Sequence, residues 1–207
     1  MSTRQSIVEA ATALFSEHGY RGASVREVCS RAGASANAIT YHFGSKEQLY
    51  RDILDSFASF QLEHAKTVLS ADPRSQQEFV IRVELFFEQL LDAYLENRET
   101  LLIMFREFEQ LLPYADDGVV GEMLKTSFAI SEFIKRAMDL GFVRANVDPD
   151  IVAGILMDRL LNQARFVHAH EMFFNTSTLD PEYRKYWVRA TLQIIFDGIN
   201  ARDEPAA

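Results

Sequence analysis

The sequence of 207 residues has little cysteine, proline or glycine: one Cys29, five prolines and nine glycines. A single cysteine cannot form a disulfide within the chain, which fits a reducing compartment. No segment approaches the roughly 20 apolar residues of a membrane-spanning helix, and the N-terminal stretch MSTRQSIVEAATALF lacks the apolar core of a signal peptide. We therefore expect a cytoplasmic protein with no membrane association.

Sequence signals for common catalytic chemistry are also missing. There is no glycine-rich phosphate loop, nucleophile elbow or zinc-ligand spacing. His168 and His170 lie two residues apart, so in a helix their side chains point about 200° apart and cannot chelate one metal ion. Glu107 and Glu109 fail as a catalytic pair for the same reason. We expect no catalytic residues, no metal site and no cofactor.

Charge is distributed unevenly along the chain. The net charge of −9 disfavours a nucleic-acid partner at first sight. Residues 1–51, however, contain six Arg and Lys against four Glu, a balance of +2, so the remaining residues carry −11. A mildly basic N-terminal part on an acidic body is weak evidence by itself, but it is compatible with a local nucleic-acid site.

The apolar residues repeat at helical spacing almost throughout, and no strand-like alternation persists. Ile7, Ala10, Ala11 and Leu14, for example, share one helical face. Serine caps and Asp-Pro pairs predict helix starts, and glycines predict helix ends. The predicted starts are Ser2, Ser24, Ser35, Ser45, Asp72-Pro73, Asp148-Pro149 and Asp180-Pro181, and the predicted ends include Gly19, Gly33 and Gly141.

These signals predict an all-α chain of about nine helices. Three short helices form an N-terminal domain, residues 1–46. A fourth helix runs from Ser45 to about Ala71 without a breaker, roughly 40 Å, and connects this head to a larger helical bundle. Residues 47–207 form the second predicted domain.

The stretch GASANAITYHFGSKEQLY, residues 33–50, explains the purpose of the head. The second and third helices are joined by a short glycine-containing turn, which is typical of a helix-turn-helix. The third helix, roughly residues 36–42, buries only Ile39, Phe43 and Ala38. Its remaining side chains are small, polar or aromatic and are suited to contact DNA in the major groove.

At these residues the sequence resembles the TetR family of bacterial transcriptional regulators. The resemblance covers AATALFSEHGYRGASVREVCSRAGASANAITYHFGSKEQLY, residues 10–50, and only the helical architecture continues beyond it. It implies a homodimer that binds a palindromic operator in double-stranded DNA and a C-terminal domain that senses a small organic molecule. We expect a ligand-responsive regulator, and a repressor in particular.

Carried over residue by residue, the resemblance implies DNA contacts by Ser24, Arg26, Ser35, Asn37, Thr40, Tyr41, His42 and Lys46. Many family members have glycine or proline where Asn37 stands and tyrosine where Thr40 stands, so the operator sequence cannot be copied from a relative. We expect Lys46, in the first turn of the fourth helix, to bind phosphate, and Thr40, Tyr41 and His42 to lie nearer the bases. Cys29 lies on an apolar stripe and is expected to be buried and inert.

The body is rich in phenylalanine and methionine, most of which we interpret as core. Some of these side chains would line a mostly apolar ligand pocket between the connecting helix and the helices that start near residues 72, 117 and 148. The candidates are Phe86, Phe87, Met104, Phe108, Met123, Phe128, Asn162 and Phe166. Further polar candidates are Arg106, Gln163, Arg165 and His170.

The last long helix, residues 180–201, is apolar on two faces. Tyr183, Trp187, Ala190 and Ile194 form one stripe, and the other consists of Leu192, Ile195, Phe196 and Ile199. A helix that covers one core needs one apolar stripe, so the second stripe predicts a dimer contact shared with the helix at 150–172.

The alternative to a DNA-binding regulator is a ligand-binding or scaffold protein of the same fold without specific DNA binding.

Overall fold

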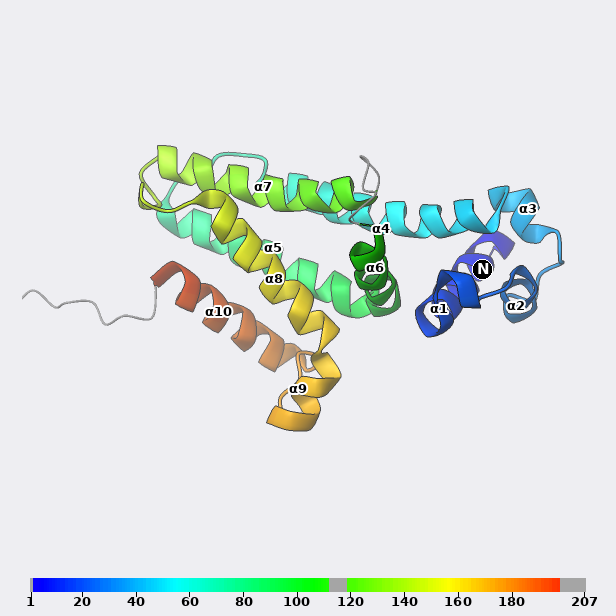
Figure 1. The fold of residues 1–207 in the computed structure, drawn as a ribbon. Coiled ribbons are helices and arrows are strands. Elements are labelled where there is room, and N and C mark those ends of the chain that lie inside the picture. The colour runs from blue at the N-terminus through cyan, green and yellow to red at the C-terminus, as the bar shows by residue number, and fades with distance from the viewer. Residues whose placement is uncertain (1, 112–118, 198–207) are drawn as a thin grey trace, which may run out of the picture.

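The computed structural model describes residues 2–111 and 119–197, and all their side chains except those of residues 107–111 and 119–123. A small head of three helices and a larger body are joined by one long helix (Figure 1). The described residues form ten helices: α1 (Thr3–Gly22), α2 (Val25–Arg31), α3 (Ala38–Phe43), α4 (Lys46–Leu69), α5 (Gln76–Glu96), α6 (Arg98–Leu111), α7 (Val119–Asp139), α8 (Pro149–Arg165), α9 (Val167–Phe174) and α10 (Pro181–Asp197). The predicted all-α fold is confirmed.

Local caps determine where the head helices begin. The Ser2 side chain accepts a hydrogen bond from the Gln5 amide at 3.3 Å. Ser24 and Glu27 form a complete capping box at the start of α2, as the sequence predicts. At Gly19 the chain leaves helical geometry, with φ 73° and ψ 169°, and the last turn of α1 follows this kink.

The third helix starts later than its sequence suggests. Ser35 does not cap it; the chain turns at residues 36–37, and α3 begins at Ala38 with Asn37 in the cap position and no side-chain cap bond. Ala38, Ile39 and Phe43 are buried, so only one narrow face of this six-residue helix contacts the rest of the head.

The helix α4 belongs to both halves of the molecule. Its first turns bury Leu49 and Tyr50 in the head, and its later turns bury Phe57, Ala65 and Leu69 in the body. The body helices α5 and α7 lie along it, and α8 covers α5 and α7 (Figure 1). One continuous apolar core therefore extends from the head into the body.

The predicted helix start at Asp72-Pro73 is wrong. The helix α5 begins at Gln76, where the Ser75 hydroxyl accepts a hydrogen bond from the Glu78 amide at 3.1 Å. The Asp72 carboxylate instead pairs with Arg136 of α7 at 3.0 Å. The Asp148 and Asp180 carboxylates do accept first-turn amides, so the other two Asp-Pro signals mark true starts.

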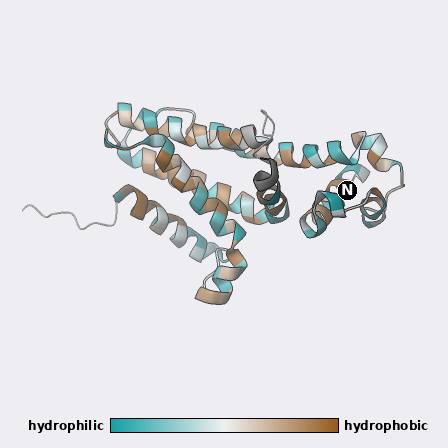
Figure 2. Ribbon diagram, in the orientation of Figure 1, coloured by the Kyte–Doolittle hydropathy of each residue, from teal (hydrophilic) through white to brown (hydrophobic). Residues whose placement is uncertain are grey.

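The tenth helix arises from a break that carries no glycine or proline signal. The expected helix over residues 150–172 stops at Phe166, whose φ of −103° and ψ of 19° are not helical, and α9 starts at Val167. The buried side chain of Val167 fixes this turn against the body. The short helix α9 projects from the body and carries exposed apolar residues at its end (Figures 1 and 2).

The two stripes of the last helix are divided differently from the prediction. Trp187, Val188 and Leu192 are buried in the core. Tyr186 and Ile194 are exposed, so the stripe that contains Trp187 and Ile194 is covered at Trp187 and open at Ile194. Ile199 lies outside the described residues. Across the described helices, no segment combines the length and apolar character needed to cross a membrane.

The kink in α1 generates a stability prediction. The backbone at Gly19 has φ and ψ values essentially restricted to glycine, and a Cβ there would lie 3.2 Å from Nη1 of Arg106. Gly19→Ala should therefore lower the free energy of unfolding by about 1–3 kcal/mol. Urea denaturation followed by circular dichroism measures this change, and an unaltered midpoint would contradict the strained geometry.

Candidate nucleic-acid interface

The residues expected to contact DNA lie on one end of the head and are mostly exposed. Ser35, Asn37, Thr40 and Tyr41 form an exposed surface, here called the α3 face, on which Tyr41 is 84% exposed. Ser24 and Arg26, at the start of α2, are exposed as well, whereas His42 and Lys46 are half-buried. Six of the eight predicted residues are therefore exposed, at the start of α2, on α3 and on the turn between them.

Packing on the opposite side holds the α3 face outward. Ile39 and Phe43 are 1% and 6% exposed, and the Arg4 guanidinium lies 4.8 Å from the centre of the Phe43 ring. Cys29 is buried, with Sγ 3.9 Å from the Ala36 carbonyl oxygen, as expected for an inert thiol. Such a helix presents its polar residues to a partner without losing core contacts.

The acidic residues of the head are largely engaged in local contacts. Glu17 accepts two hydrogen bonds from Arg31 at 3.0 and 3.2 Å, which lower the pKa of Glu17 and raise that of Arg31. Hydrogen bonding by Ser24 in the capping box lowers the pKa of Glu27. Glu47 pairs with Arg51 at 2.9 Å.

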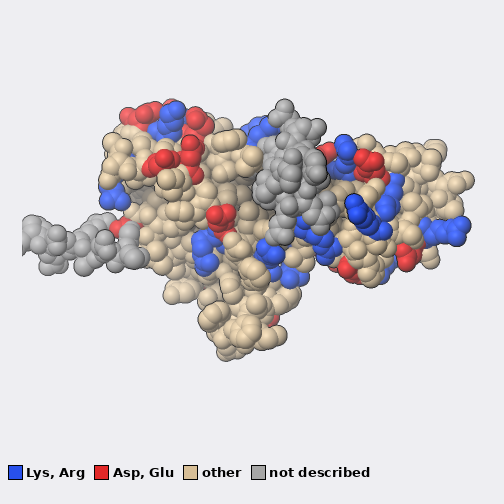
Figure 3. Space-filling model, viewed as in Figure 1, with Lys and Arg blue, Asp and Glu red and all other residues tan. Residues whose placement is uncertain are grey.

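Two exposed arginines of the head, Arg21 and Arg26, have no partner among the residues that the structure describes. Neither Arg21 nor Arg26 forms an ion pair or side-chain hydrogen bond with the described residues. Lysines and arginines are visible over the head, whereas acidic groups gather at the far end of the body (Figure 3). The local charge that is free to meet phosphate is therefore positive, although the whole chain is acidic. The charge count of the sequence signalled this asymmetry but did not single out Arg21.

Lys46 has partners within the head that the sequence did not reveal. Its ammonium donates to the backbone oxygens of Tyr20 at 2.7 Å and Ala23 at 2.8 Å, and it lies 4.3 Å from the centre of the Tyr20 ring. Lys46 thus joins the start of α4 to the end of α1. An ammonium has three N–H donors, so one remains available.

A second cation, an arginine, connects the head to the body. Arg106 of α6 donates to the backbone oxygens of Phe15 at 3.2 Å and Ser16 at 3.1 Å, in the last regular turn of α1. These carbonyls precede the kink at Gly19 and bear the partial negative charge of a helix C-terminus. Arg106 was expected among polar pocket residues, and the structure places it at the contact between head and body.

The predicted pocket residues do not gather on one described surface. Phe86, Phe87 and Met104 are buried in the core, whereas Phe128 and Phe166 are 59% and 45% exposed. The exposed Asn162 amide donates to the Asp158 backbone oxygen. Phe108 and Met123 lie outside the described side chains. The set mixes core and surface positions because residue type alone does not show which helix face is covered.

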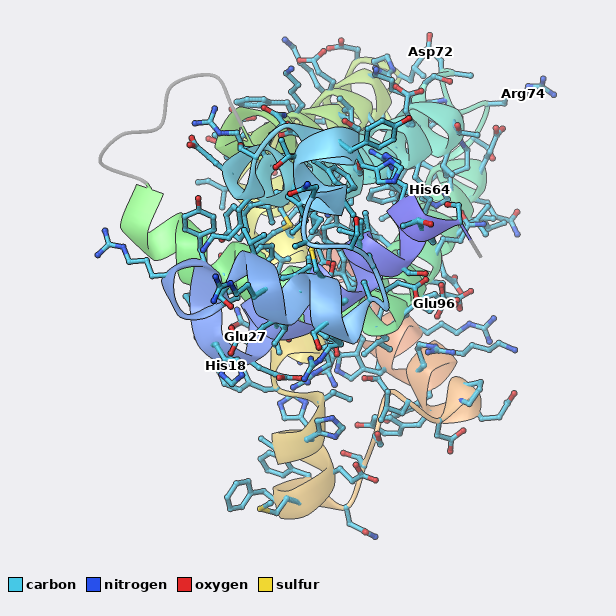
Figure 4. The ribbon with its side chains drawn as sticks, turned by 90° about the vertical axis from the view of Figure 1, so that its right-hand side faces the viewer. His18, Glu27, His64, Asp72, Arg74 and Glu96 are labelled. Carbon is cyan, nitrogen blue, oxygen red and sulfur yellow. The ribbon has the colours of Figure 1, made fainter. Side chains whose placement is uncertain are left out.

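A cleft that the sequence did not suggest lies between the head and the body. It has a volume of about 810 Å³ and is lined by α1, by the head half of α4 and by the turn between α5 and α6. Glu96, on that turn, lies behind the head when the molecule is viewed from the head end (Figure 4).

The histidines His168 and His170 contact Glu171 and Phe174 respectively, and no group of three potential metal ligands occurs among the described residues.

The fold and the site together define a helix-turn-helix DNA-binding regulator. Residues 7–53 match the family model of bacterial regulatory proteins, tetR family. The probable acrEF/envCD operon repressor of Escherichia coli K12 is 26% identical over 181 residues, which cover 80% of each chain. The repressor NicS of Pseudomonas putida is 34% identical over 107 residues, 51% of this chain and 48% of that one.

The whole fold resembles that of solved regulators. The crystal structure of PfmR, a TetR family transcriptional regulator from Thermus thermophilus, superposes with a TM-score of 0.75 at 21% identity, covering 98% of this chain and 100% of that one. The chain therefore resembles the TetR family of bacterial transcriptional regulators, by the family model over its head and by its fold over nearly its whole length. These relatives carry the names of transcriptional regulators rather than enzymes, in agreement with the absence of catalytic motifs in the sequence.

The contacts of Lys46 generate a prediction that requires no DNA. Lys46→Ala removes two charge-assisted hydrogen bonds and leaves two carbonyl oxygens to find other partners, so it should lower the free energy of unfolding by about 1–3 kcal/mol. Arg26→Ala removes an exposed side chain that has no partner among the described residues. This change should alter the free energy of unfolding by less than about 0.5 kcal/mol. Equal stability of the two variants in urea denaturation would show that the Lys46 contacts contribute nothing.

Proposed function

We propose that the chain is a homodimeric repressor that binds a palindromic operator and is released from it by a small organic molecule. The observation that carries this proposal is the α3 face, an exposed polar and aromatic surface on an acidic chain, in a head where Arg21 and Arg26 have no ion pair with the described residues. In the dimer, the spacing of the two heads would match the operator, and the small molecule would change that spacing. A cytoplasmic location and a domain boundary between residues 46 and 47 belong to the same proposal.

The head divides its contacts between phosphate and bases. Arg26 and the remaining N–H of Lys46 are suited to phosphate oxygens, because a cation at the backbone attracts every sequence alike. Thr40 and Tyr41 lie on the α3 face, where a hydroxyl group and a ring can reach base edges and thymine methyl groups. Ser24, Ser35, Asn37 and His42 complete the contact surface at its rim.

The exposed sides of α8 and α10 are proposed to form the dimer interface. Five large apolar side chains on these helices and at Phe166, which directly follows α8, are about half exposed or more: Ile151, Ile155, Phe166, Tyr186 and Ile194. Taking about 150–200 Å² for a fully exposed large side chain, they present about 500 Å² of apolar surface. A stable interface needs about 800 Å² per partner, of which about 60% is apolar, so the two areas agree.

Release would be a shift between two arrangements of the heads. A molecule bound in the body changes their spacing only by as much as its affinity differs between the two arrangements. Two paths can carry that difference to the head: the continuous helix α4 and the contact of Arg106 with α1. If the chain is instead a ligand-binding or scaffold protein, the α3 face would bind no promoter fragment with sequence preference.

Salt titration of DNA binding separates the two kinds of contact. Arg26→Ala should reduce the slope of log K against log salt by about one and weaken operator and random DNA alike. Thr40→Ala should weaken operator binding by about 1–3 kcal/mol and leave random DNA nearly unaffected. If Thr40→Ala weakens both DNAs equally, or Arg26→Ala leaves the slope unaltered, the assignment is wrong.

The dimer interface is tested by sedimentation at micromolar concentration. The unmodified chain should sediment as a dimer, and Ile155→Glu should shift it toward monomer because a carboxylate would be buried at the interface. Ile81→Glu, at an exposed apolar position of α5, is the matched control and should remain dimeric. A monomeric unmodified chain would refute the dimer, and dissociation of both variants would refute the α8–α10 location.

A further inference from the structure

Buried polar atoms without hydrogen-bond partners in the described part of the chain occur on α4 and on α7, two helices that pack against each other. Gln61 and Thr126 are 1% and 0% exposed, yet Nε2 of Gln61, Oγ1 of Thr126 and Nε2 of His64 have no partner within the described part of the chain. Together with Tyr94 these residues are called the core polar cluster. None of them was identified from the sequence as a functional residue.

Tyr94 fixes the direction of the Gln61 amide. The buried phenol donates to Oε1 of Gln61 at 2.8 Å, and burial raises the pKa of Tyr94, so the phenol stays protonated. Because Oε1 is engaged, the free Nε2 presents its two N–H groups elsewhere. His64, one turn further along α4, lies between the rings of Phe60 and Phe86, with centroids at 6.2 and 6.0 Å.

Helix register places Thr126 at the same level of the body. The helices α4 and α7 run side by side in the same direction, and Arg136 of α7 donates to the backbone oxygen of Leu69 of α4 (Figure 1). Ten residues earlier on each helix, about 15 Å, Thr126 faces the level of residue 59. Along the helix axes, Thr126 therefore lies within about one turn of the level of Gln61.

These groups can donate hydrogen bonds to a bound molecule that carries an acceptor. Buried donors in native proteins almost always have a partner, and a threonine within a helix ordinarily bonds the carbonyl oxygen four residues back. Oγ1 of Thr126 makes no such bond. The amide, the hydroxyl and the imidazole can all donate, and the side chains around them are aromatic, namely Phe57, Phe60 and Phe86.

The charges around the cluster limit the chemistry of this occupant. The lysines on the same stretches of α4 and α7, Lys66 and Lys125, are exposed, and Lys66 already pairs with Glu63 at 2.7 Å. A carboxylate buried here would have neither lysine as a counter-ion, and an isolated buried charge is costly. We propose that the core polar cluster recognises an uncharged apolar molecule through one hydrogen-bond-accepting oxygen, as in a ketone, ester or lactone. This inference rests on the proposed function, in which the body binds the releasing molecule.

The test uses matched probes that differ only in the polar group. Acetophenone, ethylbenzene and benzoate form one set, and 2-acetylnaphthalene, 2-ethylnaphthalene and 2-naphthoate form a larger one. Calorimetry with the full chain should show at least one ketone binding about five- to tenfold more tightly than its hydrocarbon and its carboxylate. Thr126→Val should weaken ketone binding about fivefold and leave binding of the hydrocarbon unaffected.

Two further variants separate recognition from folding. Thr126→Ser keeps the hydroxyl and should retain most of the ketone affinity. Thr191→Val removes another buried hydroxyl, on α10, and should leave ketone affinity unaltered. Equal effects of Thr126→Val and Thr191→Val, tighter binding of the carboxylates, equal binding of ketone and hydrocarbon, or no binding of any probe would each overturn the proposal.

Operator retardation with the same proteins distinguishes this failure from failure of the proposed function. Retained operator binding with a negative probe result overturns the core polar cluster alone. Failure to retard any promoter fragment overturns the proposed function itself, whatever the probes show.

Discussion

The continuity of α4 is the constraint on which the rest of the structure depends. One unbroken helix supplies Leu49 and Tyr50 to the head and Phe57 and Leu69 to the body, so the two parts share a core. At 24 residues it extends about 36 Å. A helix packed along its whole length moves as a unit, and a displacement at its body end therefore moves the end that packs in the head.

The end of α1 is held by cations from both sides. Lys46, at the start of α4, donates to the carbonyls of Tyr20 and Ala23, while Arg106 of the body donates to those of Phe15 and Ser16. A helix C-terminus with unsatisfied carbonyls attracts positive charge, and the kink at Gly19 divides these carbonyls into two pairs. The head is thereby oriented by one contact within itself and one contact from the body.

Sequence reasoning succeeded where the structural signal is local. The Ser24–Glu27 capping box, the Ser45 cap and the helical stripes of the head are encoded within a few residues, and they appear as predicted. It failed where tertiary contacts decide: Asp72 pairs with Arg136 rather than capping α5, and the break at Phe166 has no glycine or proline. The exposed positions of the head could be derived, whereas Lys46, Arg106 and Gln61 have partners 23 to 91 residues away that no spacing rule reveals.

In the proposed complex, two copies place the α3 face in two successive major grooves of one operator. Methylation interference distinguishes the two grooves, because methylation of guanine N7 blocks the major groove and methylation of adenine N3 blocks the minor groove. We expect interference at N7 positions in two symmetric clusters about 10–10.5 base pairs, or a small multiple of this, apart on one face of the DNA. Interference confined to adenine N3, or spread evenly along the fragment, would contradict it.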